Sequence, residues 1–600
     1  MRIQSQKSFA TIALVVIAIA SALFTGKLAT ARTTDDPVDT GTTSALGNYL
    51  AGRFAKASND TARAVTFYRR ALAREPENER IVEQAFQVEA VEGNYVNARE
   101  LALKILTKQP SNRLANVWLG VSEFQRGDFA KSRTHFKNSA KGPIGELTSV
   151  LALSWLDLAL GDSAAALRRL DKPAEVEWAR FYIAYHRALI AELAGKGDLA
   201  LENYATIFRI DSRTPRFALA YATSAARLGK VDQARSILKQ HIERAGSTTH
   251  PMVVELVDKL DGKTRLESLV SSPAKGMSEV FYGLGEALAG EGGLSIGASY
   301  IRLALHIEPE APFALATLAN IHESMKHHER AIGIYDLMPK GTALDTAVQI
   351  RKAINLSLLD RVDEAKSLLD ELATRDPTDI RPLDALGNLM RSRKRYKEAT
   401  EYYSKIIATI SEPEKQHWTY WYSRGTSYER LKQWPNAERD LKKAMELSPD
   451  QPLILNYLGY SWIDQNMNLR QGMRLIEKAV ALKPDDGYIV DSLGWAHYKL
   501  GNFPQAVRYL ERAVELRPED PVLNDHLGDA LWRVGREREA IYQWEQALTL
   551  KPEPEDEVKI KAKLASGLPP IAKPAVKKKP RRTARNKQAG SNSDIALPFQ

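Results

Sequence analysis

The chain has 600 residues, 44% hydrophobic and 26% charged, which is ordinary for a folded protein with a large core. It contains no cysteine, which excludes disulfides, thiol nucleophiles, zinc ribbons and iron–sulfur clusters. The net charge of +10 sits at the ends, because residues 1–31 carry +3, residues 571–590 carry +8 and residues 591–600 carry −1. The remaining body is neutral, whereas a nucleic-acid-binding fold carries a basic face on its body, so no nucleic-acid partner is expected.

The N-terminus has the pattern of an export signal. Arg2 and Lys7 precede an uncharged, mostly apolar stretch over residues 8–26, and residues 29–31 (Ala-Thr-Ala) fit the small-x-small cleavage pattern. The stretch is long for a signal and slightly short for a membrane span. Residues 1–31 are therefore predicted to be either a cleaved signal peptide or a retained anchor. Both alternatives send the body across the membrane, so a periplasmic location, free or tethered to the inner membrane, is expected.

From residue 45 onward, prolines and small residues recur with a period near 34. Pro449, Pro484, Pro518 and Pro552 follow one another at intervals of 35, 34 and 34 residues. Small, aromatic and leucine residues recur at fixed distances before three of the repeat ends. They are Trp421, Gly425, Tyr428, Ala437, Leu441 and Ala444; Leu493, Gly494, Tyr498, Gly501, Ala506, Leu510 and Ala513; Leu527, Gly528, Leu531, Gly535, Ala540, Trp544 and Ala547. Small side chains at fixed places let two helices approach closely, glycine suits the turn between them, and proline ends the second helix.

These residues resemble the tetratricopeptide repeat (TPR) family. The resemblance implies helix–turn–helix units that stack into a right-handed solenoid with an extended concave face. We therefore expect an all-α fold, a TPR superhelical solenoid of about fourteen helix–turn–helix repeats in two arrays, followed by a disordered basic C-terminal tail.

The period of the repeats divides the chain into segments. Residues 32–44 are predicted to be a linker, 45–238 an N-terminal TPR array and 278–552 a C-terminal TPR array. Residues 239–277 break the period and form either a hinge or one degenerate repeat, two alternatives that the period cannot separate. Residues 553–600 are predicted to be a capping segment and a disordered basic tail.

The chain offers no convincing reactive site. His322 and His327 are five residues apart, whereas a helical metal site needs a spacing of four, so a solvated loop pair is favoured. Gly283 and Gly285 follow no strand, so close helix packing explains them better than a phosphate loop. No nucleophile elbow or Walker loop occurs. We predict no enzyme activity, no catalytic residues, no cofactor and no metal; a repeat array that carries or regulates an unrecognised activity is the alternative of another class.

The family resemblance also implies which side chains line the concave groove. In the last four repeats the candidates for peptide binding are Tyr422, Glu429, Asn456, Tyr460, Tyr488, Asp491, Trp495, Lys499, Asp525 and Arg533. Aromatic rings combined with hydrogen-bonding groups suit peptide recognition. For Tyr460 and Trp495 the alternative is packing between repeats, since aromatic residues at helical spacing usually belong to a core.

The charges at the groove positions bear on the partner. Some family members hold a terminal carboxylate of a chaperone with lysine and arginine, but Asp491 and Asp525 are acidic here, which favours a basic or neutral peptide. The sequence thus predicts a non-enzymatic scaffold or adaptor of the bacterial cell envelope that binds other proteins. The basic tail is expected to touch anionic lipid or cell-wall polymer.

A narrower resemblance covers about the last 140 residues. Residues 458–461 (Leu-Gly-Tyr-Ser) and 491–495 (Asp-Ser-Leu-Gly-Trp) are similar to envelope TPR adaptor lipoproteins of Gram-negative bacteria. That resemblance implies an adaptor for a carboxyl-terminal processing protease that degrades cell-wall hydrolases. The chain lacks the lipid-bearing cysteine of that group, so its anchoring would differ.

Overall fold

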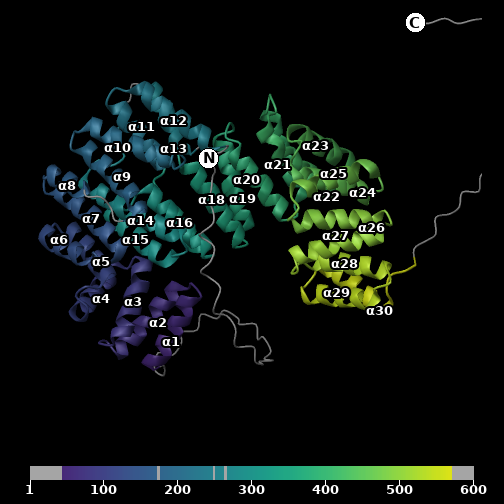
Figure 1. Cartoon of the computed structure of the whole chain (residues 1–600), viewed down its shortest axis with the longest axis horizontal. Helices are drawn as coiled ribbons and strands as arrows, with labels where there is room; N and C mark the ends of the chain where they lie inside the picture. The colour runs from purple at the N-terminus through teal and green to yellow at the C-terminus, as the bar shows by residue number, and fades with distance from the viewer. Residues whose placement is uncertain (1–43, 172–175, 247–249, 263–265, 571–600) are drawn as a thin grey trace, which may run out of the picture. The chain divides into compact units, whose positions relative to one another are not determined.

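The computed structural model describes residues 44–171, 176–246, 250–262 and 266–570 (Figure 1). These ranges contain thirty α-helices, one 3-10 helix (Lys415–His417) and no strand, which confirms the all-α solenoid. None of the helices in the described ranges is long and apolar enough to span a membrane. The predicted signal or anchor and the basic tail beyond residue 570 lie outside the described residues.

The chain divides into two compact units, residues 1–110 and residues 111–600. The first unit consists of two helical hairpins, α1 (Ala45–Ala57) with α2 (Thr61–Arg74), and α3 (Glu79–Glu92) with α4 (Tyr95–Lys108). A Cβ added to Gly52 on α1 would lie 3.0 Å from the ring of Tyr68 on α2. Glycine at this position therefore allows the two helices of the first hairpin to pack closely.

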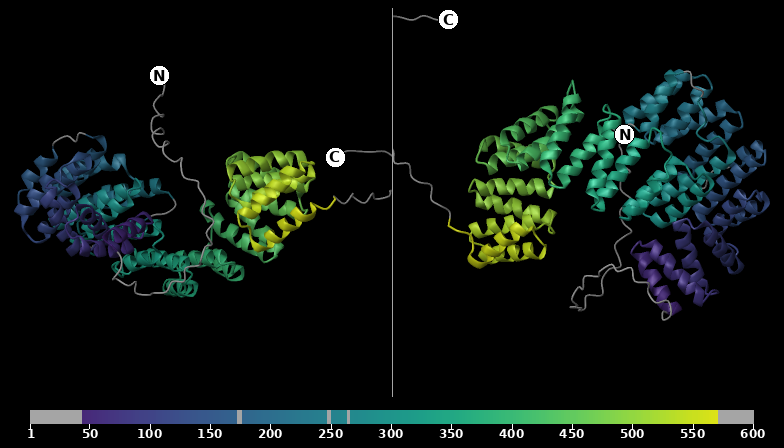
Figure 2. Two further views of the ribbon diagram at one scale, coloured as in Figure 1. Left: turned by 90° about the horizontal axis from the view of Figure 1, so that it is seen from below. Right: turned by 180° about the vertical axis from the view of Figure 1, so that it is seen from behind.

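The second unit continues the same pattern of paired helices, seen from two further sides in Figure 2. Its first part contains α5 (Arg113–Gln125), α6 (Phe129–Asn138), α7 (Gly142–Ala159), α8 (Ser163–Leu170), α9 (Glu177–Leu193), α10 (Gly197–Ile210), α11 (Pro215–Arg227), α12 (Val231–Ala245) and α13 (Pro251–Asp261). The next helices are α14 (Pro273–Gly290), α15 (Leu294–Ile307), α16 (Pro312–Ser324), α17 (His328–Tyr335), α18 (Asp345–Leu358), α19 (Val362–Arg375), α20 (Arg381–Ser392) and α21 (Tyr396–Thr409). The last are α22 (Trp418–Arg430), α23 (Trp434–Leu447), α24 (Pro452–Asp464), α25 (Leu469–Leu482), α26 (Gly487–Lys499), α27 (Phe503–Leu516), α28 (Pro521–Arg533), α29 (Glu537–Thr549) and α30 (Pro554–Ser566).

Within the described ranges, these helices form fourteen hairpins, and α13 and α30 stand alone. The hairpin α26–α27 shows why the period contains its small residues. A Cβ on Gly494 would lie 2.6 Å from the side chain of Leu510, so a larger residue would push the helices apart. Gly501 in the turn has φ +79°, a left-handed conformation that glycine adopts without strain.

Residues 239–277, which interrupt the period, contain the end of α12, the single helix α13 and the start of α14. The α14–α15 hairpin then packs back on the first helices of earlier hairpins, since α14 contacts α7 and α9, and α15 contacts α5. A Cβ on Gly276 of α14 would lie 2.2 Å from the ring of Trp155 on α7. The concave side of α5–α11 is therefore filled by the chain itself.

A buried ionic cluster marks this contact. Arg216 on α11 is 4% exposed, and its guanidinium lies 3.2 Å from the Glu279 carboxylate on α14 and 4.5 Å from the ring centre of Tyr282. Burial raises the pKa of Glu279 to about 7, while Arg216 acts in the opposite direction. On α9, burial lowers the pKa of His186 to about 3, and its Nδ1 accepts a hydrogen bond from Trp155 Nε1 at 2.9 Å. The contact between α14 and the earlier repeats is thus a closely packed interior.

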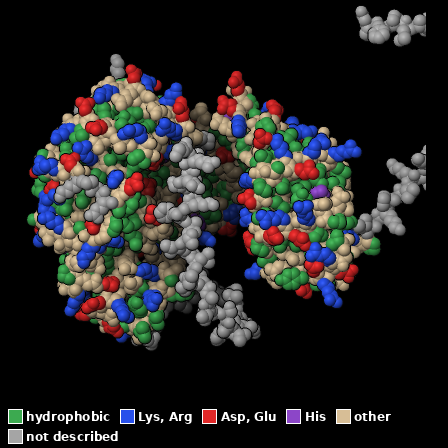
Figure 3. All heavy atoms as spheres, viewed as in Figure 1, with side chains coloured by type: hydrophobic (Ala, Val, Ile, Leu, Met, Phe, Trp, Pro, Cys, Tyr) green, Lys and Arg blue, Asp and Glu red, His purple; other side chains and the backbone are tan. Residues whose placement is uncertain are grey.

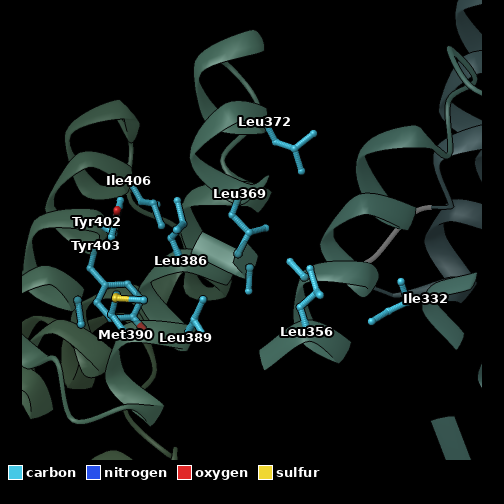
Figure 4. Close-up of a cluster of buried hydrophobic side chains, with 13 residues drawn as sticks. Ile332, Leu356, Leu369, Leu372, Leu386, Leu389, Met390, Tyr402, Tyr403 and Ile406 are labelled. Atoms are coloured by element: carbon cyan, nitrogen blue, oxygen red, sulfur yellow. The ribbon is translucent and has the colours of Figure 1, made fainter. Parts of the chain in front are cut away.

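The C-terminal hairpins have continuous apolar cores. Figure 4 shows one such cluster, in which Leu356, Leu369, Leu386 and Tyr403 come from four successive helices, α18–α21. On the face seen in Figure 3, acidic and basic side chains are interspersed, in keeping with the neutral body. These hairpins therefore bury apolar stripes against one another and present a mixed polar surface.

Candidate peptide-binding face of the C-terminal repeats

The first helices of successive C-terminal hairpins line one face. α18 contacts α20, α24 contacts α26, and α26 contacts α28. The glycines of α20, α22, α24, α26 and α28 point toward their hairpin partners, because an added Cβ would meet the second helix in each case. The side chains three residues before and one residue after each glycine therefore lie beside the face that meets the second helix. We call the surface formed by α18, α20, α22, α24, α26 and α28 the inner face.

The structure brings Asp491 and Trp495 together with a residue absent from the predicted set, His526. The Trp495 ring stacks between Tyr498 and His526, with ring centres 4.6 Å and 4.0 Å away. His526 Nδ1 lies 3.0 Å from the carboxylate of Asp491. Burial lowers the pKa of His526, but Asp491 and its acidic neighbours outweigh burial, so the net shift is upward. Trp495 is thus held by its neighbours and remains only partly buried.

Tyr422 and Glu429 lie at a second aromatic contact. Tyr422 meets the ring of Tyr457 edge to face at 5.9 Å, and the Tyr457 hydroxyl donates to Glu429 at 2.8 Å. Burial is the largest cause that raises the pKa of Tyr457 above its usual range. Glu429 therefore accepts a hydrogen bond from the next repeat and is partly oriented before any partner binds.

Asn456 and Tyr460 occupy the centre of the inner face. The amide oxygen of Asn456 is buried and has no hydrogen-bond partner among the described residues. Tyr460 is half-buried and packs against Ile463, Ile476 and Leu493. A peptide N–H could reach this oxygen only if neighbouring side chains move, because the oxygen is closed off from solvent.

Tyr488 and Lys499 lie at the two ends of α26. Tyr488 is 50% exposed and donates its hydroxyl to Asp520 at 3.1 Å. Lys499 pairs with Asp464 of the preceding hairpin at 3.0 Å. Both residues therefore bridge neighbouring repeats.

The last helix covers Asp525 and Arg533. Lys563 on α30 donates to Asp525 at 2.8 Å and pairs with Asp529 at 2.7 Å. Arg533 donates to the backbone oxygen of Pro569 at 2.7 Å, just after α30. These two predicted groove residues are therefore engaged by the chain's own C-terminal segment.

An apolar cavity of roughly 630 Å³ lies on the inner face, outside the last four repeats from which the groove residues were predicted. Ile350, Ile354 and Leu358 of α18 line one side, and Asp384 and Asn388 of α20 line the other. The exposed fractions of Ile354 and Leu358 are 43% and 62%. The spacing from the repeat glycine would have identified Asp384 and Asn388 as groove positions, because they stand three residues before and one residue after Gly387.

The histidine pair on α16 and at the start of α17 differs from expectation. His322 is 1% exposed, so the prediction of a solvated loop pair is wrong for it. Both of its ring nitrogens lack hydrogen-bond partners among the described residues, and burial lowers its pKa to about 3. The described residues contain no group of three or more side chains suited to a metal. His322 is buried because it lies on the side of α16 that packs into the hairpin.

Replacing His322 with leucine is expected to raise the free energy of unfolding by about 1–2 kcal/mol, because a buried, unpaired polar ring is replaced by an apolar side chain of similar size. The folded pKa of His322 lies below the unfolded value near 6.5, so the wild type loses stability as the pH falls from about 6.5 to 3, and His322→Leu should lose less. Thermal midpoints at pH 7 and pH 5 measure both effects. The control, His328→Leu, removes a ring nitrogen 2.8 Å from Asn355 Oδ1 and should destabilise. A destabilised His322→Leu would contradict the assignment.

Comparison with known proteins agrees with this architecture. Tetratricopeptide repeat family models match residues 492–555, 148–172 and 215–240. The chain is 29% identical over 192 residues to TPR repeat-containing protein PA4667 of Pseudomonas aeruginosa. The aligned region covers 31% of this chain and 30% of that protein. The chain therefore spans less than a third of this curated relative.

Among solved structures, the APC/C hetero-tetramer Cut9–Hcn1 aligns with 14% identity and a TM-score of 0.37 over 88% of this chain and 97% of the other. MamA of Desulfovibrio magneticus RS-1 aligns with 18% identity and a TM-score of 0.25 over 29% of this chain and 94% of the other. The three segments matched by the family models are tetratricopeptide repeats, a class of repeat that generally mediates protein–protein interaction.

Proposed function

We propose that the protein is a non-enzymatic scaffold that binds an extended segment of a partner protein along the inner face, from α18 to α26. The observation that carries this proposal is the open apolar cavity between α18 and α20, which is also lined by Tyr420 of α22. Few apolar patches of this kind stay exposed on a protein unless a partner covers them.

The chemistry of the inner face selects the partner segment. The Ile350 and Ile354 side chains suit an apolar side chain, and the exposed amide of Asn388 suits a peptide backbone. Asp384 is an acid in the same cavity, and burial is the largest cause that raises its pKa. Arg351 and Arg381 line the cavity as well, so its lining is not acidic overall, and a neutral, apolar segment fits it best. The end of the face at α28 is left out of the proposed site, because α30 engages Asp525 and Arg533.

We further propose that the partner belongs to the bacterial cell envelope. The apolar N-terminal stretch supports export, and the resemblance of the last 140 residues to envelope adaptors supports a carboxyl-terminal processing protease as a candidate partner. The direct test adds the purified full chain to such a protease and measures cleavage of a cell-wall hydrolase. A rate that does not respond to the chain would remove the protease from consideration and leave the peptide-binding proposal standing.

Changing Ile354 to glutamate is expected to weaken peptide binding about tenfold or more, because the charge would occupy the apolar cavity. Peptides selected by phage display on the immobilised full chain supply the ligand, and fluorescence anisotropy gives the Kd. Ile541→Glu on α29 is a matched control, since Ile541 is 37% exposed and lies on a second helix. Equal weakening by both variants, or by neither, would place binding elsewhere.

The absence of cysteine permits an independent localisation. A single cysteine at position 354 can carry a photo-crosslinker in the otherwise cysteine-free chain. The selected peptide should crosslink from position 354 and not from a cysteine at position 541. Crosslinking from position 541 alone would contradict the inner-face site.

A further inference from the structure

The outer face of α1, the first helix of the solenoid, is apolar and exposed. Leu46, Leu50 and Phe54 have exposed fractions of 65%, 52% and 76%, and their four-residue spacing places them on one stripe. Lys56 points the other way, because its Nζ donates to Gln84 on α3 at 2.9 Å. At 3.6 residues per turn, Lys56 lies about 80°, 120° and 160° around the helix from Leu46, Leu50 and Phe54. The apolar stripe therefore faces away from the second hairpin.

The last helix of the solenoid is built differently. The first turn of α30 contains three acids, and its exposed side carries ion pairs between Lys559 and Asp556 and between Lys561 and Glu557. Val558 is its only large hydrophobic residue with a high exposed fraction, 69%. Terminal repeats normally present a polar outer face to water. The α30 end follows that rule and the α1 end does not, so the α1 end is suited to a surface other than water.

The first hairpin is also strongly basic. Residues 45–74 contain six lysines and arginines and one acid, Asp60, a net charge of +5 within a neutral body. Arg69 pairs with Glu89 on α3 at 2.6 Å, which fixes the side of α2 that faces the second hairpin. Arg63, Arg70 and Arg74 lie about 100–140° around α2 from Arg69. These three arginines, like the apolar stripe, are turned away from the second hairpin.

We propose that this end surface, formed by Leu46, Leu50, Phe54, Arg63, Arg70 and Arg74, docks on an anionic lipid bilayer. The apolar side chains would enter the boundary between headgroups and acyl chains, and the arginines would meet lipid phosphates. No acidic residue occurs in α1, so nothing on that helix repels an anionic surface. This surface shares no residue with the peptide-binding inner face, and the proposal does not depend on that face.

Other occupants fit the end surface less well. A second copy would need about 800 Å² from each partner, whereas the stripe occupies one face of a thirteen-residue helix about 20 Å long. Packing two copies would also bring like charges together. The chain's own N-terminal segments each match only half of the surface, since residues 8–26 are apolar and offer no acid to the arginines, whereas residues 32–44 contain three acids and little apolar side chain. Seventeen residues separate Gly26 from Ser44 and span at most about 60 Å, so a retained anchor would keep α1 close to a bilayer.

An environment-sensitive fluorophore on Leu50→Cys tests the proposal in the full chain, which has no other cysteine. Phosphatidylcholine vesicles containing phosphatidylglycerol should shift its emission to shorter wavelength, and lipids brominated near the headgroup should quench it. Vesicles of phosphatidylcholine alone should have much less effect. Phe54→Cys is a second labelling site, and Val558→Cys on α30 is the control, because its exposed fraction of 69% lies between those of Leu50 and Phe54 and it lies closer in sequence to the basic tail.

The arginines supply the charge dependence. Each arginine near an anionic surface contributes about fivefold to partitioning, so the triple change Arg63→Gln, Arg70→Gln and Arg74→Gln should reduce it about 100-fold. Arg361→Gln, Arg439→Gln and Arg512→Gln together make the same change in net charge on other helices and should have little effect.

Four outcomes would overturn the proposal. The label at position 50 could be insensitive to every vesicle, or the label at position 558 could respond equally, which would assign binding to the tail. A concentration-dependent shift without vesicles would identify a second copy as the occupant. Concentration-independent shielding of position 50 without vesicles would identify residues 8–26.

Discussion

Replacing Arg216 with methionine is expected to lower the free energy of unfolding of the second unit by about 3–5 kcal/mol. The guanidinium is buried between α11 and α14, 3.2 Å from the Glu279 carboxylate. Removing it leaves Glu279 buried without its opposite charge, which costs more than the ion pair itself contributed. Urea and thermal midpoints of the full-length variant measure the loss.

The pH dependence identifies Glu279 as the cause. In the wild type its pKa is raised to about 7 in the folded state, so the folded protein binds more protons than the unfolded chain between about pH 4.5 and 7. Its contribution to stability is therefore present below that window and is lost as the pH rises through it. Without Arg216 the folded pKa should rise further, and the loss should be larger at pH 8 than at pH 5.

Two companion variants test this explanation. The double change Arg216→Met with Glu279→Gln should recover part of the lost stability, because no buried charge remains unpaired. Arg361→Met removes an exposed arginine paired with Glu364 and should leave the midpoints unchanged. A small, pH-independent effect of Arg216→Met would show that the cluster does not hold α14 in place.

Gly276→Ala is expected to lower the free energy of unfolding by about 3 kcal/mol, a large effect for one added methyl group. The new Cβ would lie 2.2–2.3 Å from three atoms of the Trp155 ring. That ring is fully buried and is hydrogen-bonded to His186, so it cannot move aside easily. Thermal melts of the full chain provide the measurement.

The same helix supplies the control. A Cβ added to Gly290 would meet no heavy atom within 4 Å, and the φ of Gly290 is not left-handed, so Gly290→Ala should be neutral or stabilise by about 0.5–1 kcal/mol. Trp155→Phe removes ring atoms that the methyl group would meet, so it should partly rescue Gly276→Ala. Equal effects at positions 276 and 290 would mean that helix propensity, and not the contact with α7, decides the result.

The repeat period predicted the architecture because the residues that recur with this period contact each other within one hairpin. The spacing from Gly494 to Leu510 and the turn at Gly501 belong to one local unit, so the sequence alone implies close packing of two helices. The positions of Asp491 and Trp495 in the same register predict that they lie on a first helix near each other. The structure places them there and adds His526 from the next repeat.

The linear pattern of residues by itself determined the all-α solenoid, its small-residue contacts and the set of positions on its first helices, because these depend on neighbours within one period. Only the tertiary structure decided that α14 fills the concave side of α5–α11, that α30 engages Asp525 and Arg533, and that a cavity opens between α18 and α20. Those features join residues separated by one or more repeats. A local period carries no information about such distant packing, because identical hairpin contacts are compatible with an open, a filled or a capped groove.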